Sequence, residues 1–351
     1  MTANTILKNI LVPTDFSELS GNALTTAIAM CKRHNATLHL LHVVDNRYFI
    51  VPHEASVTAN YLMPELEKSG MDRLVELADK INAKHNIRTE THLENGNPSD
   101  VIGKKALEVK CELIVMGTHG ASGLREFFIG SNAYAVIKNT PVPVLTIPGK
   151  KKIKEFKRIL FPIRASKGIV DKYDFILPII EKNDAELIIA GLSLPDEPYN
   201  LDPLNEEVRE LGSLLRLNNT KFRSEHFVCK NYAKKVLELA KKEKAGLIVI
   251  NASLDYKWRQ FFVGPYTQQV VNHAKVPVLS FRTFNTPLEV EETVKEEIKN
   301  MQQLSYIFSG LLCMQYLQSR IPVRQIGLTM KTASYKKRDH SEVISVFSSS
   351  S

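Results

Sequence analysis

Cysteine is scarce in this sequence and widely dispersed. There are four cysteines among 351 residues, and none of them belongs to a CxxC pair. Such spacing excludes a disulfide framework and a cysteine-based zinc site, and it is typical of a reducing compartment. The histidines show no metal-ligand spacing either, so the sequence predicts no metal site. The residues considered are Cys31, Cys111, Cys229 and Cys313, with His34, His39, His42, His85 and His92.

Long apolar runs are also lacking. The longest apolar-rich stretch outside the repeated regions, residues 304–317, has about 14 residues, whereas a membrane-spanning helix needs about 20. The first residues carry no secretory-signal pattern, so we expect a cytoplasmic protein. The net charge of +8 is concentrated in residues 150–158 and 336–338. Because these segments have the character of a connector and a tail, the charge predicts neither a nucleic-acid nor a membrane partner.

The first half of the chain alternates apolar runs with amphipathic patterns. Continuous runs of Ile, Val and Leu are typical of strands buried on both faces of a parallel sheet. These runs are residues 10–12, 38–44 and 113–116, and helical patterns cover 17–33, 65–85 and 98–109. Asn97 before Pro98 is a strong helix start, and Ser17 or Ser20 is the candidate cap of the first helix. The alternation predicts βαβ units with right-handed crossovers.

The chain contains an internal duplication. Residues 111–148 align with residues 245–282 without a gap, and residues 8–13 align with 157–162. This predicts two copies of one domain of about 145 residues. The copies differ at polar and glycine positions: Asp15, Gly117, Gly120 and Ser131 become Arg164, Asn251, Leu254 and Pro265. We interpret this pattern as a scaffold that was retained and a site that was lost in the second copy.

A glycine-rich loop follows the third of these apolar runs. It reads Gly117-x2-Gly120-x9-Gly130-Ser131, and a helix is expected from about Ser131 to Lys138. Glycine lets a backbone approach a ligand closely, and successive N–H groups form an anion-binding concavity. Free N–H groups at the helix start also favour a phosphate. The Ser131 hydroxyl either donates a further hydrogen bond or caps the helix.

Two further residues end strands at the same predicted sheet edge, where open parallel sheets bind ligands. Asp15 is placed to accept hydrogen bonds from a base or ribose, or alternatively it is a turn residue or helix cap. Val43 offers apolar surface to an adenine ring, or alternatively belongs to the core. His119, between the glycines, is interpreted as a loop residue rather than a catalytic base.

These motifs together resemble the universal stress protein family. The resemblance rests on residues 10–17, 41–45, 96–98, 116–131 and 141–145, and the glycine loop fits the family's ATP-binding signature at every fixed position. It covers residues 5–148 strongly and residues 157–282 more weakly. It implies two tandem α/β domains, each with a five-stranded parallel sheet of order 3-2-1-4-5.

The resemblance also implies a nucleotide site in the first domain alone. Asp15 and Val43 would contact the adenosine, while Gly117, Gly120, Gly130 and Ser131 would contact ribose and phosphates. With their neighbours, the predicted cofactor-binding residues are Pro13, Asp15, Val43, Met116, Gly117, Gly120, Gly130, Ser131 and Asn132. The expected cofactor is ATP, or AMP or ADP, with Mg²⁺ accompanying ATP. Family members commonly dimerise through the last strand, so residues 142–147 are expected beside 276–281 within this chain, and a homodimer is a further candidate assembly.

The predicted domains are residues 1–149 with the intact ATP motif and residues 150–284 with a degenerate second copy. Residues 285–318 are predicted to form an amphipathic helix that begins with a capping box. This helix is expected to dock on this chain or on another. Residues 319–351, which end in four serines, show no period and are expected to be disordered.

The sequence favours a regulatory role in stress survival, in which ATP is held rather than turned over. No nucleophile–base pair or general-acid constellation is evident, so no catalytic residue is predicted. Two alternatives remain open. The first is a slow ATPase or nucleotide hydrolase that uses the same loop. The second is a nucleotide-independent interaction module built from the duplicated sheet and the C-terminal helix.

Overall fold

The computed structural model describes residues 7–45, 56–118, 130–149, 152–164, 169–195, 202–252 and 265–281. The predicted C-terminal helix and tail lie outside these residues, as do His119 and Gly120 of the glycine loop. Among the described residues, no helix is long and apolar enough to cross a membrane.

Strands and helices alternate through the described part of the first half. The strands are β1 (Asn9–Pro13), β2 (Thr37–Val44), β3 (Thr89–Asn95), β4 (Leu113–Gly117) and β5 (Val144–Ile147). The helices are α1 (Glu18–His34), α2 (Ser56–His85), α3 (Pro98–Glu108) and α4 (Ser131–Asn139). Helix α2 begins nine residues before the predicted start at Glu65 and contains Pro64 near its first end.

The second half repeats the same order of elements. Its strands are β6 (Arg158–Ile163), β7 (Glu186–Ser193), β8 (Phe222–Val228), β9 (Leu247–Asn251) and β10 (Val278–Phe281). Its helices are α5 (Ile169–Asn183), α6 (Asp202–Leu217), α7 (Tyr232–Lys242) and α8 (Pro265–His273). The prediction of two tandem α/β domains is therefore confirmed.

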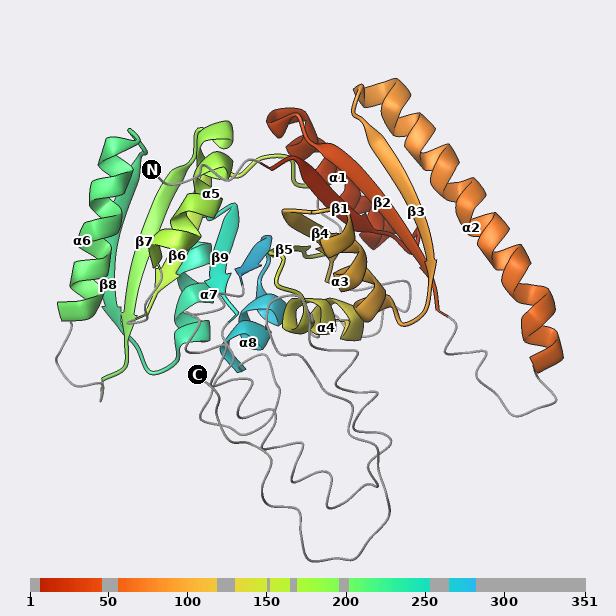
Figure 1. Ribbon diagram of the computed structural model, residues 1–351. Helices are drawn as coiled ribbons and strands as arrows, with labels where there is room; N and C mark the ends of the chain where they lie inside the picture. Colours follow the sequence, from red (N-terminus) through yellow and green to blue (C-terminus); the bar gives the residue numbers. More distant parts are fainter. Residues whose placement is uncertain are drawn as a thin grey trace, which may run out of the picture. The chain divides into compact units, whose positions relative to one another are not determined.

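The strands of both halves belong to one mixed sheet (Figure 1). Its order is β3-β2-β1-β4-β5-β10-β9-β6-β7-β8, and the neighbours within each half are parallel. The two halves meet where β5 runs antiparallel to β10, with Leu145 opposite Leu279. The Thr146 hydroxyl reinforces this junction by donating to the Val278 carbonyl oxygen at 3.1 Å.

Helices cover both faces of the sheet, which explains the continuous apolar runs. Side chains alternate across a strand, so Ile10 and Val12 enter a core with α1, α2, α5 and α6. Leu11, between them, enters a second core with α3, α4, α7 and α8. All three side chains are fully buried. A half-polar strand would leave one of these two helix layers without an apolar surface to pack on.

Two of the predicted helix starts are confirmed in detail. Ser17 is the N-cap of α1, and its hydroxyl accepts from the Ser20 amide at 3.2 Å. Asn97 is the N-cap of α3, its side chain accepts from the Ser99 amide at 3.3 Å, and Pro98 opens the helix. Helices α1 and α3 start a few residues after β1 and β3 end. Both caps therefore lie at the carboxyl edge of the first domain's sheet.

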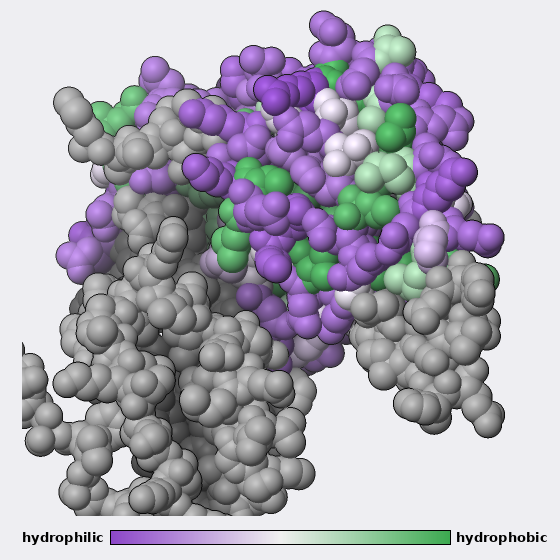
Figure 2. All heavy atoms as spheres, turned by 45° about the vertical axis from the view of Figure 1, so that its right-hand side comes forward, coloured by the Kyte–Doolittle hydropathy of each residue, from purple (hydrophilic) through white to green (hydrophobic). Residues whose placement is uncertain are grey.

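Exposed apolar side chains are most frequent on α2. Leu62, Leu66, Met71 and Val75 are each about two-fifths exposed. Figure 2, which brings the α2 side of the first domain forward, shows hydrophobic side chains as separate patches among hydrophilic ones. Scattered apolar residues of this kind are ordinary on a protein surface.

His34, at the end of α1, is expected to make the free energy of unfolding depend on pH. Burial lowers the pKa of His34 to about 4, and the charges of Lys182 and Arg33 act in the same direction. Its Nε2 atom is buried without a hydrogen-bond partner among the described residues. An unfolded imidazole takes up its proton near pH 6.5, whereas the folded one resists protonation down to about pH 4. Stability is therefore expected to fall as the pH falls through this window.

Replacing His34 with Gln is expected to reduce this acid dependence. The check is the urea midpoint at pH 7.5 and pH 5, which should differ less in His34→Gln than in the natural sequence. His226→Gln, at an exposed position of β8, is the control and should keep the original difference. The same pH difference in His34→Gln as in the natural sequence would contradict the assignment.

Candidate functional site

The carboxyl ends of three neighbouring strands lie at one edge of the sheet in the first domain, with β2 continuing three residues past the end of β1. β1 pairs with β2 so that Pro13 is opposite Leu41, and with β4 so that Leu11 is opposite Ile114. Asp15 follows β1 by two residues and Thr118 follows β4 by one, so both lie at the same edge of the sheet as Val43 near the end of β2. The Thr14 amide donates to the Leu41 carbonyl oxygen at 2.8 Å, which carries the β1–β2 pairing past the strand end.

This edge is also the point at which the chain changes face. After β1 the chain enters α1, which packs in one core, whereas after β4 it leads to α4, which packs in the other. In open α/β sheets such a switch point leaves a crevice beyond the carboxyl ends of the two strands. Gly117, the last residue of β4, is half-buried at this edge.

Asp15 is held in a turn at the start of α1. One of its carboxylate oxygens accepts from the Ser17 amide at 3.0 Å and from the Ser17 hydroxyl at 2.6 Å. Phe16, between them, adopts φ +60°, a left-handed conformation that non-glycine residues seldom take. The interpretation of Asp15 as a turn residue is thus correct, and the turn keeps its side chain at the exposed edge of the sheet.

Three other predicted residues lie at the strand ends. Met116 is buried and its side chain packs in the core beside α3 and α4. Pro13 and Val43 are half-buried. Val43 also lines a pocket of about 350 Å³ beneath α2, in which the guanidinium carbon of Arg73 lies 4.0 Å from the centre of the Phe16 ring.

Helix α4 begins with an uncapped N-terminus. Its N-cap is Gly130, with no side-chain hydrogen bond to the first turn. The alternative that Ser131 caps the helix is therefore wrong, because Ser131 is the first helical residue. The first helical bond runs from the Tyr134 amide to the Gly130 carbonyl oxygen at 3.0 Å. The amides of residues 131–133 precede it and have no acceptor within the helix.

These amides are well placed for an anion. Ser131 and Asn132 are exposed, and the positive end of the helix dipole lies at the same point. The Gly130 amide, however, donates to the Thr118 carbonyl oxygen at 2.6 Å. The Gly130 amide is therefore not one of the free N–H groups expected at the helix start, because it joins the two ends of the glycine loop. The amides without an acceptor in the helix start at Ser131.

The corresponding edge of the second domain carries a cation between aromatic rings. Arg164, at the position of Asp15, has its guanidinium carbon 4.6 Å from the centre of the Tyr266 ring and 5.3 Å from that of Tyr232. Burial raises the pKa of Tyr266, and the charge of Arg164 opposes this only in part. Pro265 opens α8 and has no N–H to offer an anion.

Sequence reasoning missed the contribution of the two tyrosines. Tyr266 aligns with Asn132, and Tyr232 aligns with Pro98, so both stand at helix starts that face the strand ends. The alignment of the two copies does contain this difference, because a smaller side chain in the first copy becomes tyrosine in the second at both positions. The structure brings Pro13, Asp15, Val43, Met116, Gly117, Gly130, Ser131 and Asn132 to one edge of the sheet, and Gly120 lies outside the described residues.

Comparisons with known proteins agree with this architecture. A model of the universal stress protein family matches residues 7–148 and 155–282. A universal stress protein of Methanocaldococcus jannaschii is 34% identical over 148 residues, which are 42% of this chain and 85% of that protein. Universal stress protein YxiE of Bacillus subtilis is 32% identical over 151 residues, covering 40% of this chain and 99% of its own.

A solved structure supports the fold over both halves. The crystal structure of a universal stress protein from Archaeoglobus fulgidus superposes with a TM-score of 0.63 at 20% identity, covering 79% of this chain and 97% of that one. At this identity the likeness concerns the fold alone. Because the family model matches both halves separately, the chain belongs to the universal stress protein family and carries its domain twice.

Proposed function

We propose that this protein is a cytoplasmic stress-response protein that holds one adenine nucleotide at the carboxyl edge of its first domain. The observation that carries the proposal is the uncapped start of α4, where Ser131 and Asn132 are exposed. The hydrogen bond from the Gly130 amide to Thr118 holds this helix start next to the end of β4. An anion is the ligand that such a helix end favours. ATP, ADP and AMP each supply one, together with a base for the apolar residues nearby.

Each predicted residue then has a role that fits its position. Amides from Ser131 onward and the loop at Gly117, Gly120 and Gly130 would surround ribose and phosphates, with Asn132 beside them. Asp15, Pro13 and Val43 would contact the adenosine, and Met116 would support the strand end from within the core. Mg²⁺ would accompany the phosphates of ATP.

The hydrogen bonds of the Ser17 hydroxyl, which contacts Asp15, favour a holding role over hydrolysis. The Ser17 hydroxyl accepts from the Ser20 amide as the cap of α1 while it donates to Asp15. It is therefore committed to the fold rather than poised to activate water or attack a phosphate. This supports a regulatory role in which the nucleotide is held rather than turned over.

Calorimetry with ATP and AMP on the full chain tests the proposal. We expect one nucleotide per chain, because Arg164 and Pro265 replace the aspartate and the serine at the second edge. Protein that is folded by circular dichroism but shows neither heat nor thermal stabilisation would contradict the proposal. Two equal sites per chain would contradict the asymmetry. Steady phosphate release that is eliminated by Asp15→Ala would replace the holding role with hydrolysis.

A further inference from the structure

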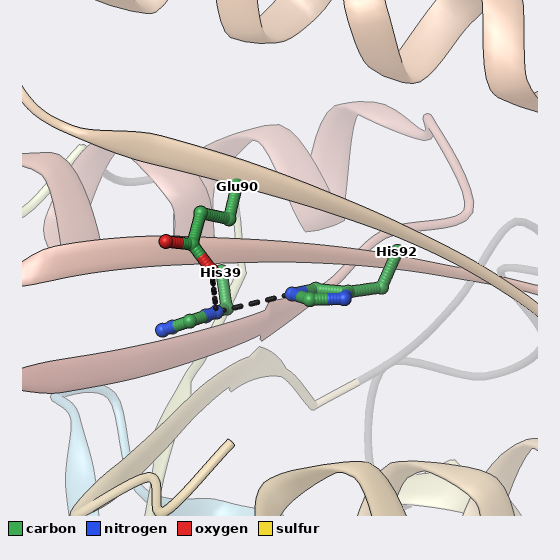
Figure 3. A group of neighbouring side chains, drawn as sticks. All are labelled: His39, Glu90 and His92. Carbon is green, nitrogen blue, oxygen red and sulfur yellow. Dashed lines mark hydrogen bonds and ion pairs between the residues drawn. The ribbon is translucent and has the colours of Figure 1, made fainter. Parts of the chain in front are cut away.

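A group of metal-ligating side chains lies on the α3 side of the first domain's sheet. His39 comes from β2, and Glu90 and His92 come from the neighbouring β3 (Figure 3). His39 is paired with Glu90 in the sheet register, and His92 follows two residues later, so all three point to the same face. His39 lies about four residues, or ~13 Å, before Val43 along β2, so this group is separate from the nucleotide edge.

The ligand atoms already lie at distances close to those of a metal site. Nδ1 of His39 is 3.0 Å from Nε2 of His92 and 3.5 Å from a carboxylate oxygen of Glu90. All three ligand atoms lie within 4.8 Å of one another. Around a tetrahedral Zn²⁺ with bonds of about 2.0–2.1 Å, neighbouring ligand atoms are separated by roughly 3.3 Å. Small rotations of Glu90 and His92 would therefore complete the geometry.

The surroundings fix the form in which His39 presents its nitrogen. Nε2 of His39 lies 3.2 Å from the Asn9 side-chain oxygen, which only accepts hydrogen bonds, so Nε2 carries the proton and Nδ1 has a free electron pair. The Glu90 carboxylate is also held in position, because Arg88 donates a hydrogen bond to its other oxygen at 2.7 Å. Outer contacts of this kind set the tautomer and orientation of metal ligands.

The charged side chains named around the group contain one more carboxylate than cation. Lys105, in the last turn of α3, lies nearby, and its ammonium pairs with Glu94 at 2.6 Å and with Glu108 at 2.9 Å. With Arg88 and Glu90, the neighbourhood has three carboxylates and two cations, a net negative charge. His39 is 4% exposed, whereas the Glu90 side chain is 38% exposed. A metal ion therefore has a route from solvent along the edge strand β3.

The second domain shows that the fold does not require this group. Register equivalents of His39, Glu90 and His92 there are Ile188, Arg223 and Glu225, and Arg158 replaces Asn9. Arg223 pairs with Glu186 at 3.1 Å and also with Glu243. An isoleucine and ordinary ion pairs thus satisfy the same place in the sheet. The three ligands and their outer amide are features of the first domain alone.

We propose that His39, Glu90 and His92 bind one divalent transition-metal ion of the Zn²⁺ class, with a fourth position open to water or another small ligand. Two imidazoles and one carboxylate select Zn²⁺, Ni²⁺ or Cu²⁺ over Mg²⁺ and Ca²⁺. In the metal-free protein His92 donates its Nε2–H to Nδ1 of His39. On binding, that proton moves to Nδ1 of His92 through solvent, and Nε2 becomes the ligand.

Competition titration of Zn²⁺ against a coloured chelator, with the full chain freed of metal, tests this site. We expect His92→Gln and Glu90→Gln each to weaken Zn²⁺ binding by at least about tenfold, because even outer-shell changes typically cost 10–100-fold. The amide of His92→Gln keeps a donor for His39, so its melting curve without metal should match that of the natural sequence. His226→Gln, on the equivalent strand β8, is the control and should bind as the natural protein does.

Binding of Co²⁺ adds a spectroscopic measurement that distinguishes this site from weak binding elsewhere on the chain. The visible spectrum of tetrahedral Co²⁺ should appear at one equivalent in the natural protein and in His226→Gln, and should be lost in His92→Gln. Unchanged Zn²⁺ affinity in both His92→Gln and Glu90→Gln would overturn the proposal. Equal competition by Mg²⁺ would overturn the assignment to the Zn²⁺ class.

Discussion

Replacing Ser131 with proline is expected to weaken ATP binding by about 100-fold or more while the first domain stays folded. The substitution removes the first available amide of α4 and puts a ring where a phosphate would lie. A hydrogen bond to a charged group contributes about 1.5–3 kcal/mol, so the lost bond alone accounts for roughly 10–100-fold. The steric effect of the ring adds to this loss.

The backbone at this point accepts proline without strain. Gly130 has φ −58° and ψ 146°, the extended conformation that a residue before proline prefers. Proline is also favoured in the first turn of a helix, where its missing N–H breaks no helical bond. The second domain already has this arrangement, because Pro265 opens α8. A loss of affinity in Ser131→Pro therefore reports on the site and not on the fold.

The reciprocal change in the second domain is the matched control. Pro265→Ser alone is expected to leave calorimetric ATP binding unchanged, since Arg164 and Tyr266 still occupy that edge. Adding Asp15→Arg and Asn132→Tyr to Ser131→Pro introduces three residues of the second edge into the first domain and should bring binding below detection. Undiminished ATP affinity in folded Ser131→Pro would refute the role given to the start of α4.

Most of the fold followed from patterns that can be recognised within a single strand or helix. The runs at β1, β2 and β4 are apolar throughout because helices cover both faces of the sheet, and the caps Ser17 and Asn97 act within their own turns. Strand β3 was not identified because its sequence, TETHLEN, has polar residues at most positions. Strand β3 is at the edge of the sheet and pairs only with β2. An edge strand of this kind can form without the continuous apolar run of a central strand.

The site was predictable only as far as backbone chemistry determines it. The comparison of the copies found the positions that changed, including Asp15, Ser131 and their counterparts. It did not reveal that the Gly130 amide is consumed by Thr118, because that bond depends on how the loop closes. It also did not show Arg164 against Tyr232 and Tyr266, since the direction of a long side chain is decided by tertiary packing.

The histidine group illustrates the same limit more sharply. His39 and His92 are separated by 53 residues in the chain, and motif spacing within one element does not connect them. They meet because β2 and β3 pair in a register that sets His39 beside Glu90. The sequence prediction of no metal site was based on local spacing, whereas a site across two strands depends on register.

Truncating Leu145 and Leu279 together is expected to show that the two domains unfold as partners. These leucines are opposite each other in the β5–β10 pair, and both are almost fully buried in one core. Each Leu→Ala change should cost about 2–5 kcal/mol. Because they share one contact, the double variant should depart from additivity by about 0.5–3 kcal/mol. Urea unfolding of the four proteins of this cycle measures the coupling.

Leu38 supplies the comparison that makes this coupling specific to the junction. It is also fully buried in the same core, but β2 is separated from β10 by three strands, so Leu38 and Leu279 lie roughly 19 Å apart at the usual strand spacing. The Leu38→Ala and Leu279→Ala costs should therefore add to within about 0.5 kcal/mol. Strict additivity for Leu145 and Leu279 as well would mean that β5 and β10 do not pair in solution. A measured coupling would instead show that the β5–β10 pair joins the predicted nucleotide domain to the second copy.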